Sequence, residues 1–201
     1  MTGLLGGTFN PPHNGHLKLA RAAQEHFALD DLAVLVAVRP GHKEVQLDAD
    51  TRLRLAQAAF PEHDVELDPH ERTVDLLKSG RWGDPLFLIG ADQFADFLTW
   101  KDPNGVLRRA RVGVATRPGF PRERLDGVLA ELAQPERVVF FEIDPIPVSS
   151  RDIRDRVARG ESVDGLVPPA VAELIASLGL YRDESEHGYT SRTPGEELKP
   201  H

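Results

Sequence analysis

Cysteine is absent from the 201-residue sequence. Disulfide bonds, thiolate nucleophiles and thiolate metal sites are therefore excluded, and nothing in the composition indicates an oxidising compartment. Long apolar runs are absent too: none approaches the roughly 20 residues that a membrane-spanning helix needs. The N-terminus shows no basic segment followed by an apolar core, as a signal peptide would. The sequence therefore predicts a cytoplasmic protein.

Positive charge is scarce. The 24 lysines and arginines are outnumbered by 32 aspartates and glutamates, which gives a formal net charge of −8. Long nucleic acids and anionic membranes bind basic surfaces, so neither is an expected partner. A small anionic ligand is compatible with this balance if cationic side chains gather locally. The sequence leaves open whether the chain forms a homo-oligomer.

Two common phosphate-binding motifs are missing. The sequence contains neither the Gly-Lys-Ser/Thr of a Walker loop nor a Gly-x-Gly-x-x-Gly dinucleotide fingerprint. The chain begins instead with a short apolar run, a glycine turn and two histidines three residues apart, followed by an amphipathic helix that we expect to run to about Ala28. This stretch reads Gly6-Gly7-Thr8-Phe9-Asn10-Pro11-Pro12-His13-Asn14-Gly15-His16.

The residue types of the opening stretch suit a phosphate group. Gly6 and Gly7 let the backbone turn and approach a ligand with no Cβ in the way. Exposed N–H groups there and at the start of the next helix form a natural anion site. The side chains of Thr8 and Asn10 can donate further hydrogen bonds. The turn therefore indicates binding of a phosphate chain.

The two histidines, His13 and His16, can face the same anion if the helix begins near Gly15. Next to bound phosphates each imidazole would favour its protonated form, and two such donors can stabilise charge that grows in a transition state. A zinc site would need an intervening glutamate or further ligands, so we predict no metal ligand. An isolated pair of this spacing is usually a helix cap and a solvated side chain, but the strand and glycine turn favour the phosphate role.

Strand-like and helix-like segments alternate along the chain. Apolar segments predict strands at residues 4–8, 32–38, 65–67, 85–90, 111–116 and 138–143. Helical periodicity predicts helices from 15 to 28, from a cap at Asp48 or Asp50 to 60, at 73–78, around Phe94, Phe97 and Leu98, and at 125–132, 150–159 and 169–178.

This alternation predicts an α/β fold with a Rossmann-like, doubly wound parallel sheet in a single domain. Ligands of such sheets bind beyond the carboxyl ends of the strands, where most of the notable residues fall. We assign the domain to residues 1–182. The segment 183–201 is rich in Glu, Ser, Gly and Pro and is expected to be a disordered tail.

The opening stretch resembles the signature of the HxGH nucleotidyltransferases, and most closely that of the bacterial nicotinate-nucleotide adenylyltransferases. The likeness extends from Gly3 to about Tyr181. Three further segments are similar to this family: Phe87-Leu88-Ile89-Gly90-Ala91-Asp92 with Trp100 after it, Arg117-Pro118-Gly119, and Val148-Ser149-Ser150-Arg151-Asp152-Ile153-Arg154. The first motif alone indicates only the superfamily, whereas the whole set in this order is more specific.

The resemblance implies a particular reaction. The phosphate of nicotinate mononucleotide would attack the α-phosphorus of ATP, giving deamido-NAD and pyrophosphate, with a magnesium ion carried on the triphosphate. No covalent enzyme intermediate is implied, and no general base is needed because the attacking phosphate is already an anion. Catalysis would consist of positioning and charge neutralisation.

The residues and the resemblance together imply three groups of site residues. The catalytic group is His13, His16, Lys43 and Arg154. The ATP-binding group is Gly7, Thr8, Phe9, Asn10, Gly90, Asp92, Ser149 and Ser150. The acceptor-binding group is Thr73, Trp100 and Lys101, the last through its backbone amide. From the residues alone, either serine could cap the following helix, and Asp92 could cap its helix or accept a hydrogen bond from a ribose hydroxyl.

The sequence departs from the family pattern mainly on the acceptor side. Residues 71–77 keep only Thr73 and Asp75 of the family's Ser-Tyr-Thr-x-Asp-Thr-Leu, and Arg39 opens a shortened loop before Lys43. We hypothesise that Arg72 or Arg39 compensates by favouring an acidic pyridine ring or its phosphate.

Alternative functions follow from this departure and from the limits of motif evidence. Another HxGH transferase would use nicotinamide mononucleotide or phosphopantetheine as acceptor. A nucleotide-binding sensor would do no chemistry, but its mark would be the loss of a motif histidine or of the late arginine, and all three are present. Arg151 stands where the family usually has Thr, so whether it contacts a ligand is open.

Overall fold

A six-stranded, all-parallel sheet forms the centre of the protein in the computed structural model, which describes residues 1–41, 45–144 and 146–182. Its strands are β1 (Thr2–Gly7), β2 (Asp31–Ala37), β3 (Asp64–Asp68), β4 (Leu86–Gly90), β5 (Arg111–Thr116) and β6 (Val138–Glu142). Their order across the sheet is β3-β2-β1-β4-β5-β6, the order of doubly wound nucleotide-binding folds. The predicted fold class is therefore confirmed.

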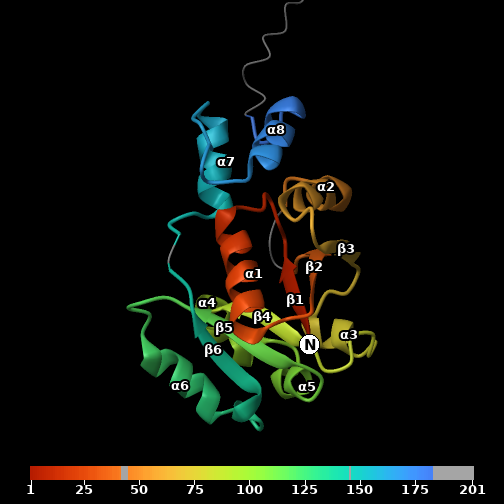
Figure 1. Cartoon of the computed structure of the whole chain (residues 1–201), viewed down its shortest axis with the longest axis vertical. Coiled ribbons are helices and arrows are strands. Elements are labelled where there is room, and N and C mark those ends of the chain that lie inside the picture. Colours follow the sequence, from red (N-terminus) through yellow and green to blue (C-terminus); the bar gives the residue numbers. More distant parts are fainter. Residues whose placement is uncertain (42–44, 145, 183–201) are drawn as a thin grey trace, which may run out of the picture.

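Helices cover both faces of this sheet (Figure 1). They are α1 (Asn14–Phe27), α2 (Ala49–Ala59), α3 (Thr73–Leu77), α4 (Ala91–Ala95), α5 (Pro103–Leu107), α6 (Arg122–Ala130), α7 (Ser150–Ala158) and α8 (Pro169–Ser177), with short 3-10 turns η1 (Phe97–Thr99) and η2 (Pro135–Arg137). Among the described residues, no helix is both long and apolar enough to cross a bilayer.

Each buried strand contributes side chains to two separate cores. Leu4 faces the core formed with α3, α4, α5 and α6, whereas its neighbour Leu5 faces the core formed with α1, α2, α7 and α8. Successive strand residues point to opposite faces, so a strand buried on both sides must be apolar throughout. This explains the unbroken apolar runs of β2 and β4.

The strand order reverses between β1 and β4. The chain runs outward from β1 through β2 to β3 and then returns to place β4 on the other side of β1, where Leu5 pairs with Leu88. The loops that follow β1 and β4 therefore diverge and leave room beyond the strand ends. Helices α7 and α8 lie at this carboxyl edge, next to the start of α1 and beside α2 (Figure 1).

Several element predictions need correction. The helix after Gly90 was expected to carry Phe94, Phe97 and Leu98 together, but α4 ends at Ala95, a 3-10 turn follows, and Leu98 is 42% exposed. The helix predicted at 125–132 begins earlier, at Arg122, and ends at Ala130. Helix α5 was not predicted; Pro103 at its first turn and the Asp102 side chain, which accepts from the Gly105 amide, form its N-terminus.

Candidate active site

The loop from β1 to α1 folds tightly around a phenylalanine. Phe9 has a φ of +50° in the left-handed region and is only 1% exposed. A Cβ on Gly7 would lie 2.8 Å from the Phe9 ring, so this position has no room for a side chain. The ring meets Phe60 and His16 edge-on, with centroids 6.0 and 5.1 Å away. Phe9, expected in the ATP cradle, thus supports His16 from the core side.

The two motif histidines contact each other at the start of α1. His13 is the residue before the helix, and its backbone N–H donates to His16 Nδ1 at 3.2 Å. The ring centroids are 3.7 Å apart. Because Nδ1 of His16 accepts this bond, the neutral ring carries its proton on Nε2. His16 therefore presents Nε2 as a donor.

His13 is neutral at pH 7 in the protein alone. Burial lowers the pKa of His13 from 6.5 to about 4, and nearby Asp152 only partly opposes the effect. Its Nδ1 is buried with no hydrogen-bond partner among the described residues. The protonated form expected from the sequence requires a phosphate anion beside the ring, which would raise the pKa.

The second motif meets the first directly. Ser149 caps α7: its Oγ accepts from the Asp152 amide at 3.1 Å. Ser150 Oγ donates to the Pro11 carbonyl at 2.8 Å, and Arg154 Nη1 donates to the Asn10 carbonyl at 2.8 Å. Residues about 140 positions apart in the chain thus form one site.

Asn10 is held on two sides. Its side chain was expected to face a ligand, but it is only 5% exposed. Its carbonyl accepts from Arg154, and its Oδ1 accepts from the Tyr181 hydroxyl at 2.8 Å. In the protein alone, Asn10 therefore joins parts of the loop to the C-terminal segment.

Arg52, which the sequence analysis missed, lies behind the same loop. It is 2% exposed and donates to four backbone carbonyls: those of Thr8 (3.0 Å), Ala37 (2.7 Å), Val38 (3.2 Å) and Leu47 (3.2 Å). It thus ties the ends of β1 and β2 together. Burial lowers its pKa, although an arginine remains charged. A signal was present, since Arg52 shares a helix face with Leu55, Ala56 and Ala59.

Two cavities beside the start of α1 have predicted site residues in their walls. The larger of these two, which we call the β2-side cavity, measures about 560 Å³. The predicted site residues that line it are Gly7, Thr8, Phe9, His16, Thr73, Trp100 and Ser150. The smaller, the β5-side cavity, measures about 140 Å³ and includes Gly90 and Asp92 in its wall. The start of α1 contributes to both, with His16 on one side and Lys18 on the other.

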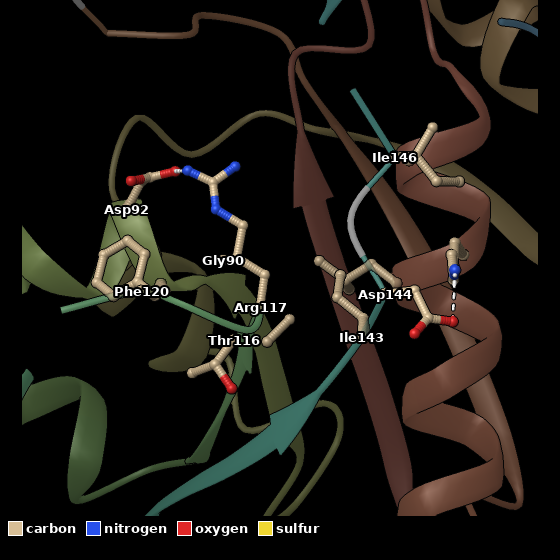
Figure 2. Close-up of a pocket in the computed structure, with 13 residues that line it drawn as sticks. Gly90, Asp92, Thr116, Arg117, Phe120, Ile143, Asp144 and Ile146 are labelled. Carbon is tan, nitrogen blue, oxygen red and sulfur yellow. Dashed lines mark hydrogen bonds and ion pairs between the residues drawn. The ribbon is translucent and has the colours of Figure 1, made fainter. Parts of the chain in front are cut away.

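Charged pairs line the β5-side cavity. Figure 2 shows the Asp92 carboxylate facing the Arg117 guanidinium, with 4.0 Å between Oδ2 and Nη2. Asp144 Oδ2 lies 3.0 Å from Lys18 Nζ. Asp92 lies in the first turn of α4, whose N-cap is Gly90. Asp92 is therefore not the cap of that helix, and its exposed carboxylate does not accept the capping hydrogen bond.

The acceptor group is only partly brought together. Thr73 begins α3, and Trp100 packs against Phe97 with ring centroids 5.1 Å apart while lining the β2-side cavity. Lys101 is exposed and lines neither cavity; its Nζ lies 2.8 Å from Asp75. Hydrogen bonds from Lys101 and Lys78 lower the pKa of Asp75 to about 2. Lys43 falls outside the described residues.

The two arginines of the β2-side cavity differ in their partners. Arg39 Nη1 lies 3.3 Å from Glu71 Oε1. Arg72 occupies the N-cap position of α3 without a side-chain capping bond and lines the cavity, and no described carboxylate lies within ion-pair distance of it. Arg151 is exposed and belongs to the wall of neither cavity. Arg72 is therefore the better placed of the two arginines to meet an incoming anion.

The fold, the glycine turn and the paired histidines define a nucleotidyltransferase-type site. The model of the cytidylyltransferase-like family matches residues 4–156 of the chain. At the finer level, this chain belongs to the nicotinate-nucleotide adenylyltransferase family, as its relatives show. A probable nicotinate-nucleotide adenylyltransferase of Rubrobacter xylanophilus is 35% identical, covering 98% of this chain and 97% of its own. One from Moorella thermoacetica is 36% identical, covering 93% and 94%.

Solved structures support the fold. The Plasmodium falciparum nicotinic acid mononucleotide adenylyltransferase complexed with NaAD is similar with a TM-score of 0.69 and 16% identity, covering 90% of this chain and 96% of that one. A putative nicotinate-nucleotide adenylyltransferase from Vibrio parahaemolyticus gives a TM-score of 0.60 at 21% identity, covering 90% and 95%. At such identities the likeness concerns the fold.

Proposed function

We propose that this protein transfers AMP from ATP to nicotinate mononucleotide, forming deamido-NAD and pyrophosphate in NAD biosynthesis. The observation that carries the proposal is the contact between the two motifs: Ser150 and Arg154 bind the carbonyls of the very loop that leads to His13 and His16. The relatives from Rubrobacter xylanophilus and Moorella thermoacetica are probable nicotinate-nucleotide adenylyltransferases, which agrees with this proposal. An α/β sheet binds ligands at this edge, where its strand order reverses.

The two cavities suit two substrates that meet at the start of α1. We place the adenosine part of ATP against Gly90 and Asp92 in the β5-side cavity, and the acceptor against Thr73 and Trp100 in the β2-side cavity. The reacting phosphates then lie near His16, which borders the acceptor side. A face of Trp100 can stack on a pyridine ring.

The reaction needs positioned donors. An oxygen of the acceptor phosphate forms a bond to the α-phosphorus of ATP, and the bond from that phosphorus to the β-phosphate oxygen breaks, so pyrophosphate leaves with the electron pair. His16 Nε2 and the N–H groups at the start of α1 stabilise the charge that grows on the phosphoryl oxygens. His13 takes up a proton when the anions bind, and Arg154 adds a fixed positive charge.

Magnesium enters the proposal as a companion of ATP. The polar groups around the β1–α1 loop are imidazoles, hydroxyls and guanidinium groups, which suit phosphate oxygens. Mg²⁺ prefers oxygen ligands, and the triphosphate itself supplies them. When bound, the ion would neutralise charge on the departing pyrophosphate. We assign no residue of this chain as its ligand.

Pyrophosphate release from ATP tests the function. We expect release with nicotinate mononucleotide that exceeds release with nicotinamide mononucleotide or with phosphopantetheine, and none without an acceptor. Faster release with one of the other two acceptors would reassign the substrate within the same class of enzyme. ATP binding with no release for any acceptor would instead indicate a sensor and overturn the proposal.

A further inference from the structure

The segment after α8 returns to the phosphate-binding loop. Gly179 and Tyr181 both have left-handed backbone angles, with φ of +59° and +63°. These two turns bring the Tyr181 side chain back toward the sheet edge, where its hydroxyl donates to Asn10 Oδ1 at 2.8 Å. Burial raises the pKa of Tyr181, so the hydroxyl stays protonated. It is the donor in this bond because an amide oxygen can only accept.

The other end of the loop is held by the same segment. The backbone amide of Asn14 donates to the Leu166 carbonyl at 2.9 Å, and its Nδ2 donates to the Gly165 carbonyl at 2.7 Å. Between Asn10 and Asn14 lies His13. Residues 165–181 therefore hold both ends of the short stretch that positions this histidine.

The surroundings of Tyr181 indicate that its hydroxyl contributes a hydrogen bond that water would not replace. Asn10 is 5% exposed, so its Oδ1 would lose its partner without replacement by bulk water if the hydroxyl were removed. Arg52 and Arg154 both lie near enough to Tyr181 to favour its ionised form, though burial outweighs them. Both guanidinium groups donate to carbonyls of the loop, at Thr8 and Asn10. The tyrosine hydroxyl thus joins the two guanidinium groups as a third donor to the same loop.

We propose that Tyr181 is a positioning residue of the nucleotide site: its hydroxyl, through Asn10 Oδ1, holds the loop in the shape that receives the phosphates of ATP. This inference rests on the proposed function only in naming ATP as the ligand. Loss of the hydroxyl leaves the loop backbone to sample other shapes, and ATP binding must then restore order. The free energy spent on ordering the loop should therefore weaken ATP binding and lower turnover.

The test is a double-mutant cycle on ATP affinity, measured by titration calorimetry on the full chain. Tyr181→Phe keeps the ring and removes only the hydroxyl. Because one hydrogen bond contributes modestly to binding or stability, we expect the Kd for ATP to rise about three- to tenfold. In the Asn10→Ala background the same change should add nothing, since the partner is already gone. Tyr189→Phe, which removes the hydroxyl of the only other tyrosine, is the matched control.

Three results would overturn the inference: an unchanged Kd in Tyr181→Phe, an equal loss in Tyr189→Phe, or effects of Tyr181→Phe and Asn10→Ala that multiply in the double variant. Melting curves at each titration temperature ensure that only folded protein is compared. Calorimetry with ATP needs no acceptor. The double-mutant cycle can therefore be interpreted even if nicotinate mononucleotide proves not to be the substrate. Failure of the proposed function would appear separately, in the pyrophosphate assay.

Discussion

The backbone amide of His13 donates to Nδ1 of His16, so the two motif histidines hold each other in place. His16 lines the β2-side cavity, and Nε2 is the donor nitrogen of its neutral ring. Removing a donor that acts on the transition state typically costs two to three orders of magnitude in rate. We expect His16→Ala to lower kcat by ~10²-fold or more.

The control for this prediction lies on the same helix. His26 is exposed in the last turn of α1 and lines neither cavity, so His26→Ala should turn over at the wild-type rate. Initial rates of pyrophosphate release at saturating ATP measure both variants. Near-normal turnover of His16→Ala would contradict the mechanism.

Titration of His13 should make the protein less stable in mild acid. Its pKa is about 4 in the folded protein and 6.5 as the ordinary value. Above pH 6.5 the ring is neutral in both states; between pH 6.5 and 4 the unfolded chain binds a proton that the folded protein does not, so stability falls as the pH falls. The loss reaches roughly 3 kcal/mol at most and stops below pH 4.

Urea unfolding between pH 7 and pH 4 measures this effect. His13→Gln, which does not titrate, should lose less stability over that range than the wild type. An identical pH dependence in both proteins would show that His13 is not the group responsible. Calorimetry in buffers of different ionisation enthalpy should also detect proton uptake when ATP binds, because a phosphate beside His13 raises its pKa.

Arg52 should be a stability determinant even though it lines neither of the two cavities at the site. Arg52→Met would remove the donor from the part-buried carbonyls of Thr8 and Ala37. Unsatisfied buried groups cost roughly 1–3 kcal/mol each, less where the site relaxes, so we expect the free energy of unfolding to fall by about 3 kcal/mol in total. Arg54 is an exposed neighbour on the same helix, and Arg54→Met should change the free energy of unfolding by less than ~0.5 kcal/mol. Urea unfolding at pH 7 compares them.

Acceptor preference should depend on one of two arginines. Arg39 is paired with Glu71, whereas Arg72 lines the β2-side cavity without a described carboxylate partner. We expect Arg72→Ala to lower the ratio of kcat/KM for the acid over the amide mononucleotide by about tenfold, the scale of one charge-assisted hydrogen bond. Arg39→Ala should change that ratio little. Equal ratios in wild type and both variants would exclude either arginine as the determinant.

Local pattern was enough to predict the sheet, whereas the family resemblance placed the second motif in the same site as the first. The apolar runs of β2 and β4 and the glycine turn before α1 are short-range signals, and parallel strands must bring their carboxyl ends to one edge. By contrast, the hydrogen bond between Tyr181 and Asn10 joins residues 171 positions apart. Nothing in the sequence around either residue carries that information.

Errors of the sequence analysis have related causes. Arg52 was not expected in the core, because an arginine on a helix is usually solvated. Its burial is favourable only because four backbone carbonyls accept hydrogen bonds from its guanidinium group. Asn10 was expected to face a ligand because its side chain can donate, whereas tertiary contacts bury it. Leu98 was placed in a continuous helix, but the chain passes into a 3-10 turn after Ala95. In each case tertiary structure overrides a local preference.

Residues 149–181 donate hydrogen bonds to the loop at Asn10 and Pro11, which bears on how the site forms during synthesis of the chain. All six strands lie before residue 143, so a nascent chain of that length already contains the whole sheet. It lacks Ser150, Arg154 and Tyr181, the donors to the loop. The first of the two motifs to leave the ribosome therefore gains these three donors only after the closing residues of the domain have emerged, and affinity for ATP should rise to its full value only then.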